Sequence, residues 1–493
     1  MNNIPKVKLG LVAVSRDCFP VELSRNRRDR VVRECGKKKI ALSTSDTVVE
    51  NEKDALKVLG ELSEKSVNAL VIYLGNFGPE GPTTWLAQKF DGPVMFVAAA
   101  EESGENLIQG RGDAFCGMLN VSYNIGLRQL KPHIPENPVG QAGDIAEKIE
   151  KFLPVAKILI GLKRLKIFTF GPRPHDFYAC NAPIKPLYDL GVEVMENSEL
   201  DLLDIFQKAK DNPEIEKVAQ EMAGDLGAGN TYPDLLPKLA MYEVALKTFF
   251  ADHLGSAQFA VFANKCWPAF ESYFGFVPCF VNSRLAAQGI PVACEVDIYG
   301  ALSEYILTCA TELPATLLDI NNTVPDDMYE NAGEKTKNYK SNDLFMGFHC
   351  GNTAGSCLLQ GEMKYQLIMN RLMEPEGKPD ITRGTLEGRI RPGDITIFRL
   401  QSTADGRLRA YAAEGEILDI DPNSFGSIGV FAIHEMMRFY RHTLIEKRFP
   451  HHTAVAFQHV GRTLYYAAKM LGVESFDFNR PSGQLFPTEN PFE

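Results

Sequence analysis

The sequence predicts an α/β protein with two Rossmann-like α/β domains followed by a β-rich, barrel-like C-terminal domain. In the first two thirds, short apolar runs alternate with amphipathic helical stretches, which is typical of parallel sheets with crossover helices. After about Asn338, segments alternate on a period of two between tight turns, which is typical of antiparallel sheets. Since 493 residues exceed one ordinary core, we predict domains at 1–163, 164–338 and 339–493.

In the first domain, β-branched runs predict strands and amphipathic stretches predict helices. The strands are LGLVAV (9–14), KIALST (39–44), ALVIYLG (69–75) and PVMFVAA (93–99), with helices at 51–65 and 83–90. The loop GNFGPEGP (75–82) lacks a Lys-Ser/Thr pair, so we interpret it as a turn and not a phosphate loop. The run RNRRDR (25–30) predicts a solvated helix face or a subunit contact.

In the second domain, LKIFTFG (165–171) and FAVFA (259–263) predict further parallel strands. The stretch 291–322 contains two apolar runs, the first ending on Glu295 and the second on Asp319, with a helix expected from 297 to 311. In an open parallel sheet such strand tips meet at one edge. Two unpaired carboxylates there are costly, so the pattern calls for a cation, a shared proton or water, and we favour a divalent metal ion.

The third domain reads as an antiparallel barrel or sandwich. Its expected strands are GEMKYQLIM (361–369), GTLEGRI (384–390), DITIFRLQS (394–402) and RLRAYAAEGEIL (407–418), with helices near 434–447 and 460–471. His451 and His452 stand at the entry to a further strand, where adjacent side chains point to opposite faces, so at most one is expected to face a given site.

Composition excludes several classes of protein. The net charge of -11 argues against nucleic-acid binding, and no apolar run reaches membrane-spanning length. The N-terminus reads as a first strand and not a signal sequence, so the expected location is cytoplasmic. Ten scattered cysteines without a C-x-x-C pair indicate free thiols and not disulfides or zinc ligands.

Several other residues are candidates for ligand binding. His349 ends an apolar segment and precedes a loop containing Asn352. A mixed Glu, Asp and His set suits Mn²⁺, Mg²⁺, Co²⁺ or Fe²⁺ better than Zn²⁺. Trp267 either walls a pocket or fills the core, and Arg16, just past a strand, either holds a polar ligand or makes a surface ion pair.

Several motifs together resemble the L-fucose isomerase and L-arabinose isomerase superfamily. They are NKCWPAF (264–270), PCFVNSRLAAQGIP (278–291), CEVDIYGAL (294–302), FHCGN (348–352) and HHT (451–453). The resemblance implies a ketol isomerase with a manganese-type centre held by Glu295, Asp319 and His452. His349 is the nearest match to a further histidine of the arabinose isomerase branch, although Asp at 319 is closer to the fucose isomerase pattern.

The implied reaction interconverts an aldose of the pentose or 6-deoxyhexose type and its 2-ketose through an enediol. Glu295 and Asp319 would act both as metal ligands and as the acid/base pair. A metal-assisted hydride shift would use the same ligands. The resemblance also implies a homo-oligomer, with a hexamer favoured, and sugar-binding residues expected at Arg16, Asn76, Trp85, Trp267 and Asn352.

Two other functions remain open. An isomerase of an anionic aldose, such as a 6-sulfo sugar of the sulfoquinovose type, would need a cationic subsite, for which Arg16, Arg173 and Lys265 are candidates. A non-catalytic sugar-binding protein would also use paired α/β domains, but would need no metal for turnover.

Overall fold

The computed structural model describes residues 3–491, which form two compact units. The N-terminal unit consists of 5–160 and 463–472, and the C-terminal unit consists of 161–462, the remaining C-terminal residues and the short segment up to Ile4. Mixed α/β architecture with parallel sheets and a large β-rich part is confirmed. The Rossmann-like description and the domain boundaries at 163 and 338 stay predictions.

The N-terminal unit is built on a parallel five-stranded sheet of order β2-β1-β3-β4-β5. Its strands are β1 (Leu9–Val14), β2 (Leu42–Thr44), β3 (Ala69–Leu74), β4 (Val94–Ala99) and β5 (Val139–Gly140). All residues of β1, β3 and β4 are buried, as continuous apolar runs in a sheet covered on both faces should be. The four predicted strands are confirmed.

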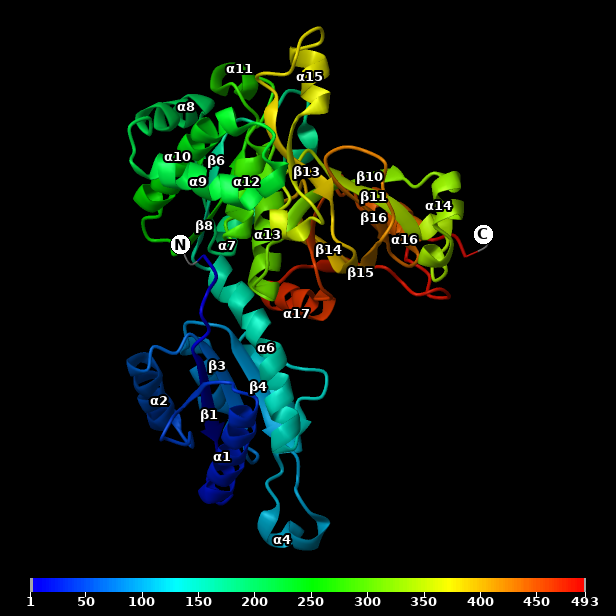
Figure 1. Cartoon of the computed structure of the whole chain (residues 1–493). Helices are drawn as coiled ribbons and strands as arrows, with labels where there is room; N and C mark the ends of the chain where they lie inside the picture. The colour runs from blue at the N-terminus through cyan, green and yellow to red at the C-terminus, as the bar shows by residue number, and fades with distance from the viewer. Residues whose placement is uncertain (1–2, 492–493) are drawn as a thin grey trace. The chain divides into compact units, whose positions relative to one another are not determined.

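This unit also contains helices, several of which lie beside the sheet (Figure 1). They are α1 (Val21–Lys37), α2 (Glu52–Glu64), α3 (Glu80–Lys89), α4 (Leu107–Gly110), α5 (Ala114–Leu127), α6 (Ala142–Leu162) and α17 (Gly461–Leu471). The solvated face predicted for the arginine-rich run of α1 is wrong in part, because Arg27 and Arg28 are buried. Arg27 donates hydrogen bonds to the carbonyl of Gly75 and the carboxylate of Glu101, which compensate its charge.

The C-terminal unit begins with a parallel four-stranded sheet of order β7-β6-β8-β9. Its strands are β6 (Leu165–Phe170), β7 (Glu193–Asn197), β8 (Phe259–Asn264) and β9 (Val292–Cys294). The helices of this part are α7 (Lys185–Asp189), α8 (Glu199–Lys208), α9 (Glu214–Leu226), α10 (Leu236–His253), α11 (Phe270–Phe274), α12 (Cys279–Ala287) and α13 (Ile298–Thr311). Aromatic side chains such as Phe168, Phe249 and Phe262 fill the space between this sheet and α10.

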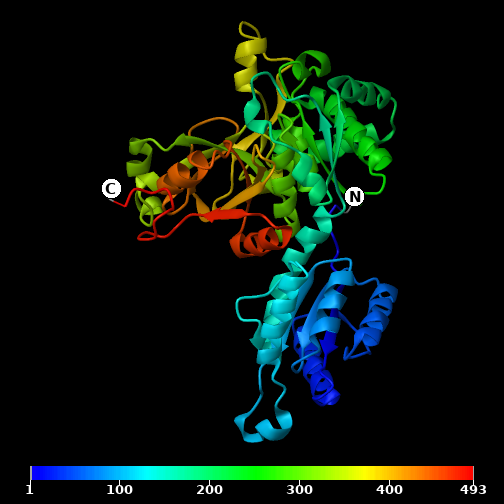
Figure 2. The same cartoon turned by 180° about the vertical axis from the view of Figure 1, so that it is seen from behind.

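A nine-stranded mixed sheet forms the rest of this unit and is seen from behind in Figure 2. Its order is β12-β13-β16-β11-β10-β17-β14-β15-β18, and an additional pairing of β15 with β16 closes six of these strands into a ring. The strands are β10 (Thr316–Thr323), β11 (Leu344–His349), β12 (Glu362–Tyr365), β13 (Arg383–Arg389), β14 (Gly393–Ser402), β15 (Leu408–Leu418), β16 (Ser427–Ala432), β17 (His452–Ala456) and β18 (Ser475–Phe478). Short helices connect them: α14 (Asp326–Ala332), α15 (Leu367–Met373), α16 (Met436–Phe439) and a π-helical segment (Tyr440–Ile445).

Two strand predictions need correction. The stretch 361–369 is a strand only to Tyr365, because Gln366 caps α15 by accepting from the backbone N–H groups of Ile368 and Met369. Asp319 is not at the tip of a strand in the parallel sheet. It lies within β10, which pairs antiparallel with β11 and β17. A short apolar run fits a parallel or an antiparallel sheet equally well, so the sequence did not distinguish them.

Within the described residues, every helix is too short or too polar to cross a membrane.

Candidate active site

Glu295 is placed by a tight connection between β9 and α13. The strand ends at Cys294, and Asp297 caps the helix by accepting a hydrogen bond of 2.9 Å from the N–H of Gly300. Between them, Glu295 and Val296 have φ angles of 60° and 57°. Left-handed backbone costs of order 1–3 kcal/mol in such non-glycine residues and clusters at functional sites. The chain therefore holds the Glu295 carboxylate in a strained turn at the sheet edge.

Three predicted ligands meet around one imidazole nitrogen. Asp319 and His452 are register partners on β10 and β17. Nε2 of His452 lies 3.1 Å from Oε2 of Glu295 and 3.4 Å from Oδ1 of Asp319. Both carboxylate oxygens are buried and lack a hydrogen-bond partner among the described residues. His452 forms one possible metal-holding group with Glu295 and His349 and another with Asp319 and His451. Because orphaned buried oxygens are costly, a divalent cation beside His452 would satisfy them.

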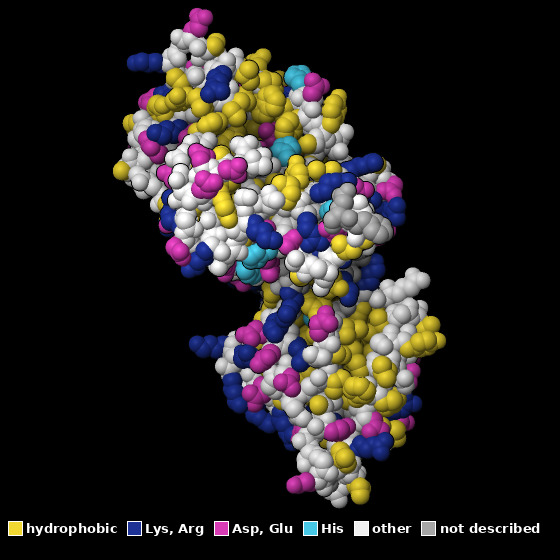
Figure 3. All heavy atoms as spheres, turned by 90° about the vertical axis from the view of Figure 1, so that its right-hand side faces the viewer, with side chains coloured by type: hydrophobic (Ala, Val, Ile, Leu, Met, Phe, Trp, Pro, Cys, Tyr) yellow, Lys and Arg dark blue, Asp and Glu magenta, His cyan; other side chains and the backbone are white. Residues whose placement is uncertain are grey.

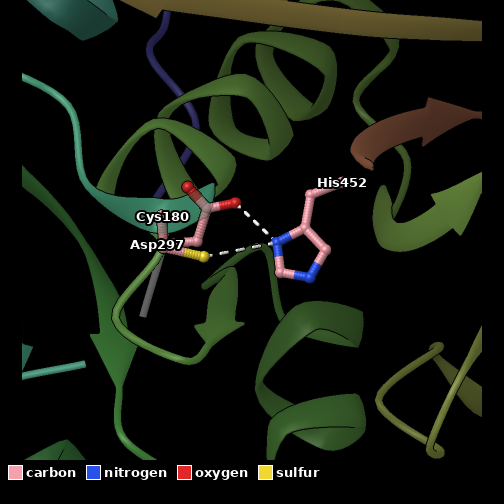
Figure 4. A group of neighbouring side chains, drawn as sticks. All are labelled: Cys180, Asp297 and His452. Carbon is pink, nitrogen blue, oxygen red and sulfur yellow. Dashed lines mark hydrogen bonds and ion pairs between the residues drawn. The ribbon is translucent and has the colours of Figure 1, made fainter. Parts of the chain in front are cut away.

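A supporting layer holds His452 from its other side (Figure 4). Nδ1 of His452 lies 2.8 Å from Oδ2 of Asp297 and 3.7 Å from Sγ of Cys180. Asp297 also accepts two hydrogen bonds, of 2.6 and 2.8 Å, from the buried guanidinium of Arg399. With Nδ1–H donated to a carboxylate, the Nε2 lone pair faces Glu295 and Asp319, as in many metal-ligating histidines.

The pKa shifts of the site residues indicate that one positive charge lies among the acidic side chains. Burial would lower the pKa of His452, but its contacts with Asp297, Cys180 and Glu295 raise it well above the usual value. Burial would likewise raise the pKa of Glu295, but His452 and Trp267 lower it. Asp297 has a pKa held far below its usual range, against burial, by Arg399 and His452. Either an imidazolium proton or a metal cation supplies the missing charge.

The two neighbouring histidines differ in what they offer. The rings of His349 and His452 lie 5.9 Å apart, and ligand atoms of Glu295, His349 and His452 form one possible metal-holding group. However, Nδ1 of His349 accepts a hydrogen bond of 2.9 Å from the N–H of Cys350. Burial lowers the pKa of His349, so the ring is neutral and carries its proton on Nε2. This arrangement favours a hydrogen-bond donor over a metal ligand.

His451 also approaches the site, which corrects the expectation that only one of the paired histidines can do so. Its Nε2 lies 3.7 Å from Oδ1 of Asp319. The alternation rule does not apply, because β17 begins at His452 and His451 belongs to the preceding connection.

A cavity of about 270 Å³ opens beside the three ligands. Trp267 lines it, which is the first of the two alternatives for this residue, and donates its Nε1–H to Oε1 of Glu295 over 3.2 Å. Asn352, three residues after His349 in the sequence, is buried, but it does not line the cavity. Among the described lining residues there is no Lys or Arg, and most are apolar or aromatic. The volume is close to the lower end of the range of roughly 300–1,000 Å³ for ligand pockets, which suits a small molecule.

The other predicted sugar-binding residues lie in the N-terminal unit. Asn76 is buried, its Oδ1 accepts from the N–H groups of Arg16 and Gly78, and its Nδ2 donates to Ser15. Asn76 thus organises the loops after β1 and β3. The Arg16 guanidinium lies over the Phe77 ring and lines an open depression of about 860 Å³ that also contains Lys53. Trp85 is half-buried on α3. A role in sugar binding stays a prediction for all three.

The two other cationic candidates are already engaged within the C-terminal unit. Lys265 is buried and donates to Glu199 over 2.8 Å. The Arg173 guanidinium lies 5.6 Å from the centre of the Tyr178 ring.

Sequence reasoning missed Asp297, Arg399 and Glu271. Asp297 stands at the start of a predicted helix, so the sequence could have predicted its capping role. The sequence could not have predicted its contact with His452. Arg399 carried a clearer signal, since a charged residue within the apolar run DITIFRLQS requires a buried partner. Glu271 follows the CWP motif and lines the cavity.

Comparison with known families gives two matches. The family described as "Fucose/sulfoquinovose isomerase, N-terminal domain" matches residues 10–163, and "L-fucose isomerase, C-terminal domain" matches residues 347–478.

Similar curated proteins carry the name sulfoquinovose isomerase. The protein from Alkalicoccus urumqiensis is 25% identical over 65% of this chain and 66% of its own length. That from Priestia megaterium is 25% identical over 67% of this chain and 68% of its own length, and that from Clostridium sp. is 27% identical over 56% of each. The matched stretch thus spans about two thirds or less of these relatives.

Among solved structures, a periplasmic solute-binding protein from Actinobacillus succinogenes with bound D-allose covers 62% of this chain and 93% of its own length at 12% identity. Its TM-score of 0.17 carries no argument for the sugar-binding alternative. The two family matches and the isomerase relatives agree with the motifs read from the sequence. The chain belongs to the fucose isomerase superfamily.

Proposed function

We propose that the protein is a metal-dependent isomerase of an anionic sulfosugar of the sulfoquinovose class, which it interconverts with the 2-ketose. The observation that carries the isomerase assignment is the meeting of Glu295, Asp319 and His452 around two unpartnered carboxylate oxygens. The names of the relatives favour a sulfosugar over the neutral pentose or 6-deoxyhexose that the motifs first led us to expect.

Glu295, Asp319 and His452 would hold the metal ion, for which Mn²⁺ is our first choice and Mg²⁺ or Co²⁺ are alternatives. When bound, a divalent cation supplies electrostatic stabilisation of the negative charge that develops on the sugar oxygens. The pairing of His452 with Asp297 keeps the histidine in the tautomer that such a role needs. His349 is the less suitable fourth ligand, since its Nδ1 accepts from the backbone.

The chain's own part in the reaction is proton transfer. Removal of the aldose C2 proton and addition of a proton to O1 give the enediol. Return of a proton to C1 and loss of one from O2 then give the ketose. We assign the carbon-bound protons to the carboxylates of Glu295 and Asp319, which exchange roles in the reverse direction. The Trp267 N–H holds Oε1 of Glu295 and leaves Oε2 toward the other ligands.

The sulfonate of the substrate requires a cation. No described residue that lines the cavity is Lys or Arg, so we place the sulfonate outside it. Lys265 is paired with Glu199 at 2.8 Å and Arg16 lies 3.6 Å from Glu80, so a sulfonate would compete with an acid for either cation.

A panel of aldoses with added Mn²⁺ tests this function. Ketose formation from sulfoquinovose with a kcat/KM at least roughly tenfold above those for glucose, arabinose and fucose supports it. A preference for a neutral aldose would replace the sulfosugar with the neutral substrate class. The absence of ketose from every sugar, with metal present, would refute the isomerase assignment.

We also propose a closed homo-oligomer, with a hexamer favoured, and a cytoplasmic location in keeping with the free cysteines among the described residues. Figure 3 shows hydrophobic side chains gathered on the surface of the N-terminal unit. On α5, four apolar side chains at four-residue intervals are each more than 60% exposed: Phe115, Leu119, Tyr123 and Leu127. Such a stripe along one helix face is unusual for a monomer and fits a subunit contact.

A further inference from the structure

Glu271 is a buried acidic residue that lines the cavity beside the predicted metal ligands. Its side chain is completely buried on the short helix α11, and neither carboxylate oxygen has a hydrogen-bond partner among the described residues. It lines the same cavity as Glu295 and Asp319. Folded proteins rarely leave such groups unsatisfied, so its presence calls for a ligand.

Aromatic packing fixes the position of this carboxyl group. The neighbouring Phe270 and Phe274 stack with ring centres 4.1 Å apart. Both rings also contact Tyr242, at 5.5 and 5.9 Å, within the core behind α11. Glu271 therefore stands on a rigid element, as a residue that orients a ligand should.

The group is suited to an uncharged partner. Burial raises the pKa of Glu271 to about 7, and its own backbone N–H opposes this only in part. Since no described Lys or Arg lines the cavity, the protonated acid is the form that burial favours near neutral pH. A carboxylic acid offers one donor and one acceptor, and a sugar hydroxyl group offers the same pair.

Apolar side chains also line the cavity. Val277, Ile368, Met369 and Leu372 line the cavity with Glu271. Apolar side chains suit the C–H groups of a sugar, while a few fixed polar groups set its orientation. They do not suit a sulfonate, which a nearby carboxyl group would also repel when ionised.

We propose that Glu271 is a substrate-binding residue that exchanges hydrogen bonds with one hydroxyl group beyond C2 of the bound sugar. This contact presents C1 and C2 to Glu295 and Asp319 and directs the anionic end of the sugar away from Glu271. The proposal rests on the proposed isomerase function and adds a residue that selects among sugars by a hydroxyl group.

The test combines variants with substrate analogues. The kcat/KM values of the wild type, Glu271→Gln and Glu271→Ala are measured for the parent aldose and its 3-, 4- and 5-deoxy analogues. With the wild type, one analogue should lose roughly tenfold, as expected for a lost hydrogen bond. With Glu271→Ala the parent aldose should lose a similar factor, and that analogue should lose no more. Equal analogue penalties in both proteins would overturn the proposal.

Further measurements separate binding from structure. Glu271→Gln keeps the size of the side chain, and it should remove the dependence of KM on a group titrating near pH 7. An unchanged pH profile would contradict the proposal even if Glu271→Ala does not fold. Glu387→Gln is the matched control, because burial also raises the pKa of Glu387 but that residue does not line the cavity. It should behave as the wild type.

A separate outcome would show that the proposed isomerase function itself is wrong. A wild type that converts no aldose refutes the function. Calorimetric titration of the Mn²⁺-loaded protein with the reduced sulfosugar, an alditol, then decides on Glu271. Binding to the wild type that is roughly tenfold weaker in Glu271→Ala supports the contact. Equal affinities, or no binding to either, overturn it.

Discussion

Nδ1 of His452 lies 2.8 Å from Oδ2 of Asp297, and this pair, both members fully buried, orients the imidazole toward Glu295 and Asp319. Arg399 holds the same carboxylate with two hydrogen bonds, so three residues from distant parts of the chain fix one ring nitrogen. Arg399 in β14 therefore supports the site through Asp297, although it does not contact Glu295 or Asp319 itself.

The first prediction concerns this support. Asp297→Asn should weaken Mn²⁺ affinity about 10- to 100-fold, because the imidazole loses the negatively charged acceptor that fixes its tautomer and raises its basicity. It should also destabilise the fold by about 3–5 kcal/mol, because Arg399 is left as an uncompensated buried charge. Calorimetric metal titration and denaturant unfolding measure the two effects. The double variant Asp297→Asn/Arg399→Gln should regain stability but not metal affinity. Recovery of both would show that Asp297 acts only through folding.

The second prediction concerns the acids. Glu295→Gln and Asp319→Asn should each lower kcat by at least about 10³-fold, since each removes both a ligand and a proton-transfer group. Thermal stability without metal should change little, because each change removes a partly paired charge together with one buried carboxylate oxygen that lacks a hydrogen-bond partner. Asp326→Asn, at an exposed position on α14, is the control and should leave turnover unchanged. Substantial turnover by either active-site variant would remove that residue from the mechanism.

The third prediction is a pH effect in the N-terminal unit. His133 is buried, stacks on Phe152 at 5.2 Å and meets the edge of Tyr466 at 4.5 Å. Burial, with a smaller effect of Lys469, lowers the pKa of His133 to about 4. The unfolded chain therefore binds a proton that the folded chain does not between about pH 6.5 and 4, and stability falls as the pH drops through that window.

Between pH 7 and pH 5 this single group should cost about 2 kcal/mol. Urea unfolding of the wild type and of His133→Phe at both pH values measures it. The variant should lose about 2 kcal/mol less than the wild type on acidification. An identical pH dependence in the two proteins would show that His133 titrates normally.

The fourth prediction concerns assembly. The double variant Leu119→Glu/Tyr123→Lys should shift the protein to smaller species in analytical ultracentrifugation, because charges replace the centre of the exposed α5 stripe. Leu56→Lys on α2 is a matched control, since Leu56 is equally exposed but lies outside the stripe. A wild type that sediments at its chain mass of 54.8 kDa would contradict the proposed oligomer.

Local sequence patterns predicted much of the fold and part of the candidate site. Continuous apolar runs predicted β1, β3, β4, β6 and β8, because strands covered on both faces must be apolar throughout. The resemblance of short motifs to known isomerases selected Glu295, Asp319 and His452, and the structure brings these three side chains together.

What the sequence could not supply were pairings between distant segments. Asp319 was expected at a strand tip beside Glu295, but it meets His452 through the antiparallel pairing of β10 with β17. Arg399 and Asp297 are 102 residues apart in the sequence, and no local pattern links them. Glu271 was missed for a related reason. A glutamate in a short helix is ordinarily exposed to solvent, and only the tertiary packing of α11 places this one in the lining of the cavity.

The most direct test of the account is calorimetric titration of EDTA-treated protein with Mn²⁺, followed by assay of the same sample for isomerisation. We expect one ion bound per chain in the wild type, no binding at that site in the double variant Glu295→Gln/Asp319→Asn, and turnover that appears only as the ion binds. Binding of equal stoichiometry and affinity in the double variant, or full turnover of the wild type without any divalent metal, would contradict it.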